Sequence, residues 1–426
     1  MKIIQSISFI VFATAVLAQV PQPAAAQSKP IVIHAGTLHI GNGSVLTNQY
    51  LGFQDGKITY LAAEKPNWSN AEWVEAGQHH VYPGLIVLDT TLGITEVDSI
   101  KATRDFQESG DVNPNIRAII AYNTDSEIIP TQRFNGILTA QVTPRGGLVS
   151  GQSAIVQLDA WNWEDAAIKA EDGIHINWPA KKVRRFDFAT VGRSWQENKQ
   201  HDSNLQTLDQ LFADAKSYPT FAKEKPNLKL AAMQGLLTGD KRLYIHADDA
   251  GSILEACERA QRWGVKHPVL VGAAQADQVA DFLAKHQIPV IVQQVHNLPE
   301  REDSPVDSGY TLANRLIAKG VKVALSYPSP SSGRNLPFFA GTCAAYGLDK
   351  EKALQLITAN PAEILGLEQR LGQLKVGLDA TLFISEGDAL DMRTNKLTHA
   401  FIQGRLLDLE GRQQKLYQRF HKKYAK

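Results

Sequence analysis

Apolar runs and helical stretches alternate through the second half of the chain. The runs are short and bounded by turn residues, as expected of buried strands. They span residues 243–247, 268–272, 289–295 and 321–327. The stretches between them carry apolar side chains at helical spacing. They span residues 252–264, 277–287 and 310–319, with another helix expected from Leu336. Strands that alternate with helices predict parallel strand–helix units.

A further apolar run, Leu85–Leu88, follows the turn signal Pro83-Gly84 and leads into the polar residues Asp89, Thr90 and Thr91. A strand buried on both faces is typical of an α/β barrel, and barrel enzymes place their chemistry at the C-terminal ends of the strands. The fold class predicted is therefore α/β, with a TIM-like (β/α)8 barrel over residues 82–372. Residues 144–151 and 186–229 read less clearly, as a loop-rich region and a polar excursion.

Both ends of the chain read as short β-runs broken by glycine and asparagine. These runs lie between residues 30 and 81 and again between 379 and 412. Within the first group, Gln54-Asp55-Gly56-Lys57 predicts a hairpin turn.

Residues 1–26 read as a secretory signal peptide. Lys2 is followed by an apolar stretch from Ile3 to Leu17, and the small residues at 24–26 offer a cleavage site. The predicted location is therefore outside the cytoplasm, most simply a bacterial periplasm. No other stretch approaches the length of a transmembrane helix.

The last residues, 413–426, predict a basic helix with Leu416, Phe420 and Tyr424 on one face. Such a helix could touch anionic lipid, but we expect it to dock on the protein with its basic side in solvent.

The charge balance bears on nucleic-acid binding, and the two cysteines bear on whether a disulfide forms. The 426 residues contain 44 basic and 44 acidic side chains, which gives no electrostatic case for nucleic-acid binding. Cys257 and Cys343 could pair in an oxidising compartment, although their apolar, helix-like settings favour buried free thiols.

Two segments carry a resemblance to a known family. The first is Pro83-Gly84-Leu85-Ile86, and the second is Leu356–Ile384, which contains a Thr-x-Asn-Pro-Ala segment and a glycine pattern after it. They resemble segments of the amidohydrolase superfamily, most closely its imidazolonepropionase-like branch, in which the first segment leads into a metal-binding His-x-His pair. The resemblance implies a barrel with a small composite β-sandwich domain, built here from residues 27–81 and 373–412. It also implies a metal-dependent hydrolase.

The positions that the resemblance assigns to metal ligands are only partly filled. Asp89 and Thr91 stand at the two histidine positions, and His246 matches the histidine of the fifth strand. The sixth-strand position falls at Gly272, and the aspartate of the eighth strand falls within residues 325–328, which contain no carboxylate. The metal motif set is therefore degenerate.

A rebuilt site remains an alternative. Its catalytic candidates are Asp89, His246 and His296, and Asp89 and His246 are its candidate metal ligands. Acidic residues 300, 302 and 303 lie near His296 in the sequence. Lys169 is a possible match for the family's bridging lysine. The metal would be Zn²⁺ or Mg²⁺ if the protein is active, and there would be none if it is not.

Two functions follow from these observations. The first is an exported hydrolase of amide or other non-peptide or dipeptide C–N bonds. The second is a catalytically silent relative that binds a small molecule at the barrel mouth, or supports an active paralogue in an oligomer. Either way, the expected partners are a small-molecule substrate or ligand and possibly a second subunit.

Overall fold

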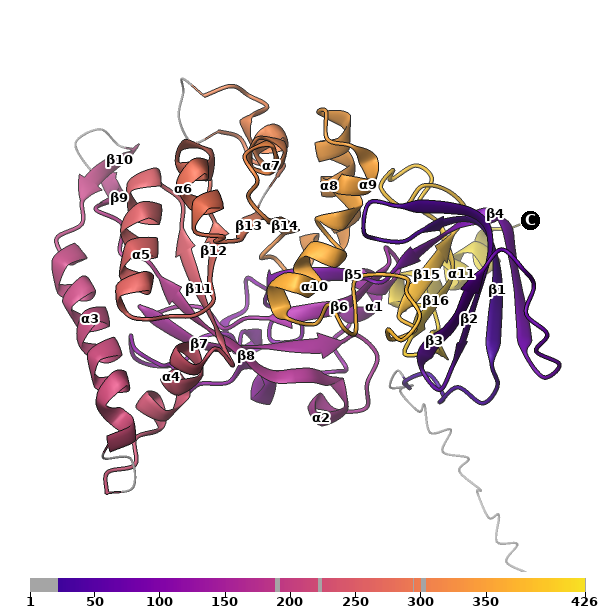
Figure 1. The fold of residues 1–426 in the computed structure, drawn as a ribbon, viewed down its shortest axis with the longest axis horizontal. Coiled ribbons are helices and arrows are strands. Elements are labelled where there is room, and N and C mark those ends of the chain that lie inside the picture. The colour runs from indigo at the N-terminus through magenta and orange to yellow at the C-terminus, as the bar shows by residue number, and fades with distance from the viewer. Residues whose placement is uncertain (1–21, 188–191, 221–223, 294, 300–303, 426) are drawn as a thin grey trace, which may run out of the picture.

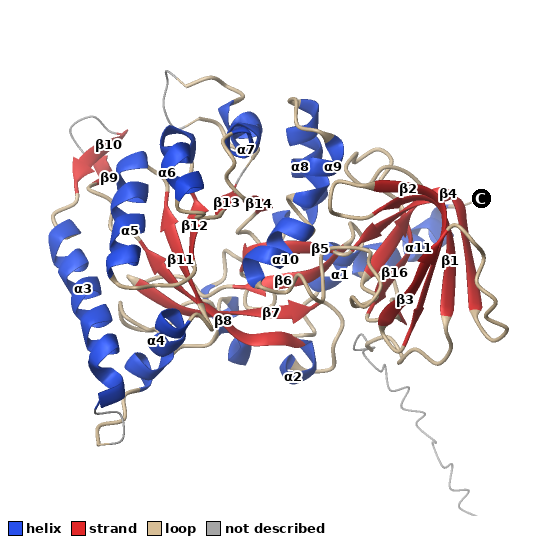
Figure 2. Ribbon diagram, in the orientation of Figure 1, coloured by secondary structure: helices blue, strands red, loops and turns tan. Residues whose placement is uncertain are grey.

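The computed structural model describes residues 22–425 except 188–191, 221–223, 294 and 300–303. The predicted signal peptide falls mostly on residues 1–21, which lie outside the described residues. The chain forms a barrel and a separate sheet, and in Figure 2 the sheet lies to the right of the barrel and most of the helices. None of the helices within the described ranges is long and apolar enough to cross a membrane.

The terminal sheet combines strands from both ends of the chain, in the order β17-β16-β15-β4-β1-β2-β3 (Figure 1). Its strands are β1 (Ile31–His39), β2 (Val45–Gln54), β3 (Lys57–Ala62), β4 (Glu72–Pro83), β15 (Leu382–Ser385), β16 (Leu397–Ile402) and β17 (Arg405–Leu406). The two halves join where β4 pairs with β15. The predicted hairpin is confirmed, because Gln54 pairs with Lys57 across Asp55 and Gly56, both at positive φ.

Within the described residues, eight strands close into the predicted barrel, in the order β11-β12-β13-β14-β5-β6-β7-β8. They are β5 (Leu85–Thr90), β6 (Ile137–Val142), β7 (Val149–Gln157), β8 (Ala167–Asn177), β11 (Arg242–Ala247), β12 (Pro268–Gly272), β13 (Val290–Gln293) and β14 (Val323–Ser326). The strands predicted in the second half of the chain agree with β11 to β14 within a few residues.

The third barrel strand departs from a regular TIM barrel. β7 runs antiparallel to both β6 and β8. The connection from β6 to β7 is residues 143–148, which is too short for the crossover of a dozen or more residues that parallel strands need. This geometry explains why strand–helix alternation is not readable in the first half of the barrel.

Helices flank the barrel mainly after β8. They are α3 (His201–Ser217), α4 (Leu228–Thr238), α5 (Ala250–Arg262), α6 (Ala280–Lys285), α7 (Ser308–Ala318), α8 (Leu336–Ala345) and α9 (Lys350–Gln355). The shorter α1 (Ile129–Arg133) and α2 (Trp163–Ala166) lie earlier in the chain, and β9 (Lys182–Asp187) and β10 (Gly192–Glu197) form a hairpin outside the barrel. Side-chain caps fix helix starts; Asp249, for example, accepts a hydrogen bond from the Ser252 amide at the start of α5.

The Thr-x-Asn-Pro-Ala segment closes the N-terminal end of the barrel. It forms α10 (Ala359–Leu365), whose Ile364 and Leu365 pack in one buried cluster with Ile86 and Leu88 of β5. The Asn360 side chain donates to the carbonyl of Val323 on β14. The segment therefore has a structural role, and the opposite end of the barrel is left for the site.

The basic terminal helix is present as α11 (Arg412–Tyr424), but none of its side chains is buried. The apolar face expected to dock on the protein is partly covered, because Leu416 is 39% exposed and Phe420 49%, and Leu416 lines a surface hollow together with Ile128 and Thr131. Gln418 donates to Glu410, which lies two residues before the helix begins.

Candidate metal centre

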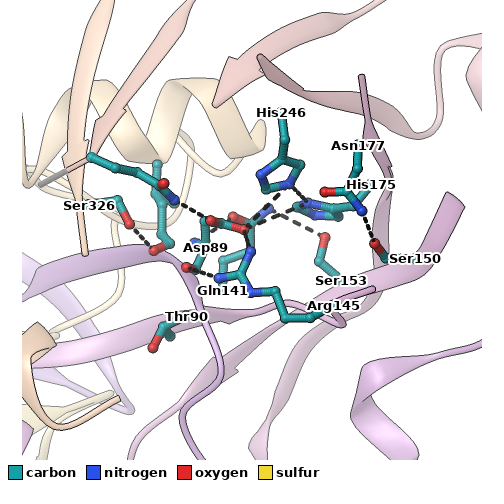
Figure 3. Close-up of polar contacts among 12 residues, drawn as sticks. Asp89, Thr90, Gln141, Arg145, Ser150, Ser153, His175, Asn177, His246 and Ser326 are labelled. Carbon is teal, nitrogen blue, oxygen red and sulfur yellow. Dashed lines mark hydrogen bonds and ion pairs between the residues drawn. The ribbon is translucent and has the colours of Figure 1, made fainter. Parts of the chain in front are cut away.

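Polar side chains from several barrel strands meet at the C-terminal mouth of the barrel. Asp89 lies at the end of β5, Gln141 on β6, His175 on β8, His246 on β11 and Gln293 at the end of β13. Figure 3 shows Asp89, His175 and His246 pointing toward one another. The mouth is where α/β barrels assemble their chemistry.

Asp89, His175 and His246 each bring one potential ligand atom into a small cluster. The Nδ1 atom of His175 lies 3.0 Å from Nε2 of His246. Oδ1 of Asp89 lies 3.7 Å from the first nitrogen and 3.8 Å from the second. A circle through atoms at these separations has a radius of about 2.0 Å, which is the usual distance from Zn²⁺ to histidine nitrogen and carboxylate oxygen.

The backbone of Asp89 is held in an unusual conformation. Its φ is +47°, in the left-handed region that costs a non-glycine residue about 1–3 kcal/mol. Two side chains fix it: Gln141 accepts from the Asp89 amide at 3.0 Å, and Arg145 donates to the Asp89 carbonyl at 2.7 Å. The strained turn aims the carboxylate at the two histidines.

The carboxylate of Asp89 is fully buried and heavily hydrogen-bonded. Arg145 donates to Oδ1 at 2.7 Å, and the side chain of Gln293 donates to Oδ2. Burial alone would raise the pKa of Asp89, but the charge of Arg145 and the nearby His246 and His175 hold it well below its usual range. Asp89 is therefore an anion at neutral pH.

Both histidines are neutral at neutral pH. Burial lowers the pKa of His246 to about 4 and that of His175 well below its usual value. Two neutral nitrogens 3.0 Å apart repel through their lone pairs unless a proton or a cation lies between them. Neutral imidazole is also the form that binds metal.

A second layer of polar contacts supports the centre from inside the barrel. Gln141 donates to the buried carboxylate of Asp172 at 2.9 Å, and the hydroxyl of Tyr244 donates to the same oxygen at 2.6 Å. Burial, and after it the charge of Asp172, raises the pKa of Tyr244, so its hydroxyl stays protonated. The Tyr244 ring stacks on His175 with ring centroids 4.4 Å apart, which fixes that imidazole.

The donor set fits one divalent metal ion. A carboxylate and two imidazoles suit Zn²⁺ better than Mg²⁺, which prefers oxygen ligands. One feature competes with such an ion: Arg145 already places a positive charge on Oδ1 of Asp89. The structure thus combines ligands at a fitting separation with an internal cation beside them.

The structure brings together two of the three residues named from the sequence. Asp89 and His246 belong to the cluster, but His296 does not. β13 ends at Gln293, so His296 lies beyond the strand, where its Nε2 bonds to Thr342 at 2.7 Å and its ring packs against Phe339. The acidic residues 300, 302 and 303 lie outside the described residues.

The other family positions carry no ligand. Gly272 ends β12, and the hydroxyl of Ser326 on β14 donates to the carbonyl of Leu88. Lys169 bonds to Asp172 at 3.2 Å. It lies six residues before His175 on β8, or roughly 20 Å along a strand, so it cannot bridge at the mouth.

Sequence reasoning missed His175 and Arg145. A strand signal for His175 is present in the sequence, in the alternation Ile174-His175-Ile176-Asn177 just before Trp178-Pro179. This alternation puts His175 and Asn177 on one face of the strand. Arg145 lies in the Pro144–Gly147 loop and carries no local signal for its role.

Comparisons with known proteins agree with this architecture. A sequence model described as the Amidohydrolase family matches residues 210–407, a stretch that contains His246 but neither Asp89 nor His175. The structure resembles that of an amidohydrolase from Thermotoga maritima with a TM-score of 0.78 at 21% identity, covering 89% of this chain and 99% of that one.

Among curated relatives, a 5-methylthioadenosine/S-adenosylhomocysteine deaminase of Syntrophobacter fumaroxidans is 29% identical over 198 residues, which cover 39% of this chain and 45% of the relative. This chain thus matches less than half of that relative's length. The protein of the same name from Acetivibrio thermocellus is 20% identical over 375 residues, covering 81% of this chain and 82% of the relative. The family model covers 198 of the 426 residues, and the closed barrel and the sheet built from both termini agree with the fold of the Thermotoga maritima amidohydrolase, which this chain resembles.

Proposed function

We propose that this protein hydrolyses a C–N bond of a small polar molecule at a centre where Asp89, His175 and His246 hold one divalent metal ion. The observation that carries the proposal is the convergence of the three ligand atoms within 4.8 Å of one another. Three protein ligands leave an open position, as catalytic zinc sites require. Zn²⁺ held there would supply a bound water with a pKa lowered to about 7 and a Lewis acid for a carbonyl oxygen.

Two neighbouring side chains have roles of their own. Arg145 fixes the Asp89 carboxylate and brings a guanidinium to the mouth, where it can stabilise negative charge that develops on a substrate oxygen. Gln293 holds the other carboxylate oxygen of Asp89 and also lines a cavity of about 620 Å³. A molecule bound in that cavity lies against the side chain that fixes Asp89.

The walls of this cavity favour a small polar substrate. Carboxylates and amides line it, among them Asp248, Asp277, Gln275 and Gln278. Its volume is in the range of ordinary small-molecule sites. Proteins that resemble this chain are named as a deaminase of 5-methylthioadenosine and S-adenosylhomocysteine and as a prolidase. A substrate panel should therefore include 5-methylthioadenosine, S-adenosylhomocysteine and Xaa-Pro dipeptides.

A second function is favoured by the ion pair between Arg145 and Asp89. A guanidinium 2.7 Å from Oδ1 neutralises the buried carboxylate without any metal. In this alternative the protein is a silent relative that binds a ligand in the cavity. Metal content distinguishes the two functions.

The test combines metal stoichiometry with hydrolysis of the panel. We expect about one Zn²⁺ per chain, because the site offers one set of three ligands. A chelator should remove the activity, and added Zn²⁺ should restore it. His175→Ala should abolish both, while His296→Ala, a matched change of a histidine outside the cluster, should leave both intact. A metal-free wild-type protein that takes up no Zn²⁺ would refute the metal-dependent function.

A further inference from the structure

Helix α11 presents an apolar, aromatic face to solvent. Leu416, Phe420 and Tyr424 follow one another at four-residue spacing, so they lie on one face of the helix, with Tyr417 beside them. Their exposed fractions are 39%, 49%, 71% and 69%. Four large apolar or aromatic side chains on one short helix form an unusual exposed patch for a soluble surface.

The same helix is strongly basic. Residues 412–424 contain five lysine and arginine side chains and no acidic one. Lys415, Arg419 and Lys422 lie three or four residues apart and so share a face that is distinct from the apolar one. Since the whole chain has a formal net charge of +0, the remainder carries a net charge of −5, and the positive charge is concentrated here.

One side of the helix lies against the protein. Gln414 is the most covered side chain among the described residues of α11, Leu416 is 39% exposed and Phe420 49%, and Gln418 bonds to Glu410 just before the helix. Gly411 directly precedes the helix, and an added Cβ there would meet the ring of Phe134 at 2.7 Å. Arg412, Lys415, Leu416 and Arg419 border a hollow of the protein surface, and Tyr417, Tyr424, Lys422 and Lys423 remain exposed for contact with a partner.

We infer that α11 binds the surface of an anionic phospholipid bilayer. An amphipathic helix with aromatic and leucine side chains on one face and Lys and Arg on the other lies in the plane of the interface, with its apolar face at the headgroup boundary. The five positive charges match anionic headgroups. Since no described helix is long enough to span a membrane, the contact is peripheral.

Two other partners fit the helix less well. A second copy of this chain would bring five like charges against five, and four side chains fall far short of the ~800 Å² per subunit of a stable interface. A nucleic acid would match the charge but leave the exposed apolar face unused.

The experiment measures co-sedimentation of the full chain with vesicles of phosphatidylglycerol and phosphatidylcholine. At low salt we expect the protein to bind the vesicles that contain phosphatidylglycerol about tenfold more tightly than vesicles of pure phosphatidylcholine. Binding to the anionic vesicles should weaken as the salt concentration rises. The double variant Leu416→Ser/Phe420→Ser and the double variant Lys415→Glu/Lys422→Glu should each weaken binding about tenfold or more. These side chains are exposed, so the variants should keep the wild-type circular dichroism and substrate hydrolysis.

A matched control replaces exposed apolar residues elsewhere. Val376→Ser/Met392→Ser changes side chains that are 53% and 72% exposed, and should leave vesicle binding unchanged.

Three results would each overturn the inference. They are equal binding to both vesicle types, no binding to anionic vesicles at low salt, and a Leu416→Ser/Phe420→Ser protein that binds as the wild type does. A wild-type dimer that Leu416→Ser/Phe420→Ser converts to a monomer would assign the helix to self-association instead and overturn it as well. If the wild-type protein binds anionic vesicles but hydrolyses none of the substrates, only the proposed function is refuted.

Discussion

Replacing Arg145 with methionine should destabilise the metal-free protein far more than the metal-bound one. Arg145 donates to the buried Oδ1 of Asp89 and to its backbone carbonyl, both at 2.7 Å. Removing one partner of a buried ion pair costs about 3–5 kcal/mol, because the other charge stays buried without compensation. The neighbouring histidines compensate only in part, because burial has the largest effect on their pKa values and lowers both, although the change also removes the Arg145 charge that lowers them.

A bound cation changes that balance. It would supply the positive charge that Arg145→Met removes, which leaves mainly the lost hydrogen bond to the carbonyl, about 1–2 kcal/mol. Saturating Zn²⁺ should therefore recover roughly 2–3 kcal/mol more in the variant than in the wild type. The assay is urea-induced unfolding of wild type and variant, each with and without Zn²⁺.

Arg133 offers a matched control for this prediction. It forms a buried ion pair with Asp159 at 2.8 Å, and Asp159, which also pairs with Arg405, contacts none of the three proposed ligands. Arg133→Met should lose the same free energy of unfolding with and without Zn²⁺. The reasoning is refuted if Zn²⁺ rescues Arg145→Met no better than Arg133→Met. It is also refuted if Arg145→Met costs less than about 1 kcal/mol without metal.

Three further predictions concern single side chains. His296→Ala should leave the affinity for Zn²⁺ unchanged in a competition titration; a loss of about tenfold or more would place His296 at the centre. Tyr244→Phe should lower the free energy of unfolding by about 1–3 kcal/mol, because Asp172 loses a buried donor at 2.6 Å. An unchanged urea midpoint would contradict that role. Burial raises the pKa of Cys257 and Cys343 to about 12, so both stay protonated at pH 8 and should react with Ellman's reagent only after unfolding. Rapid labelling of the native protein would contradict the buried state.

The fold was predictable where local patterns and topology agree. The run Leu85–Leu88, bounded by a turn and a polar cluster, identified the first barrel strand, which the structure extends from Leu85 to Thr90. The second half of the barrel followed from alternating strand and helix periods. β7 could not be identified in this way, because it returns antiparallel after a six-residue connection, and both of its faces are buried.

The candidate site was half predictable for a related reason. Asp89 and His246 lie at the ends of strands that could be recognised, so their place at the mouth followed. His175 lies on β8, whose local signal at the mouth is a four-residue alternation, too short to identify a barrel strand on its own. Arg145 reaches Asp89 from a loop 56 residues away in sequence, a tertiary contact that no local pattern encodes. His296 was misplaced because the strand was predicted to continue beyond Gln293.

The central claim is that Asp89, His175 and His246 bind one metal ion. The most direct test is a crystal structure of the protein grown with Zn²⁺, with diffraction data collected on both sides of the zinc absorption edge. The proposed centre predicts an anomalous peak about 2.0–2.2 Å from Oδ1 of Asp89, Nδ1 of His175 and Nε2 of His246. A map without that peak, with Arg145 still paired to Asp89 and the two imidazoles hydrogen-bonded to each other, would contradict it.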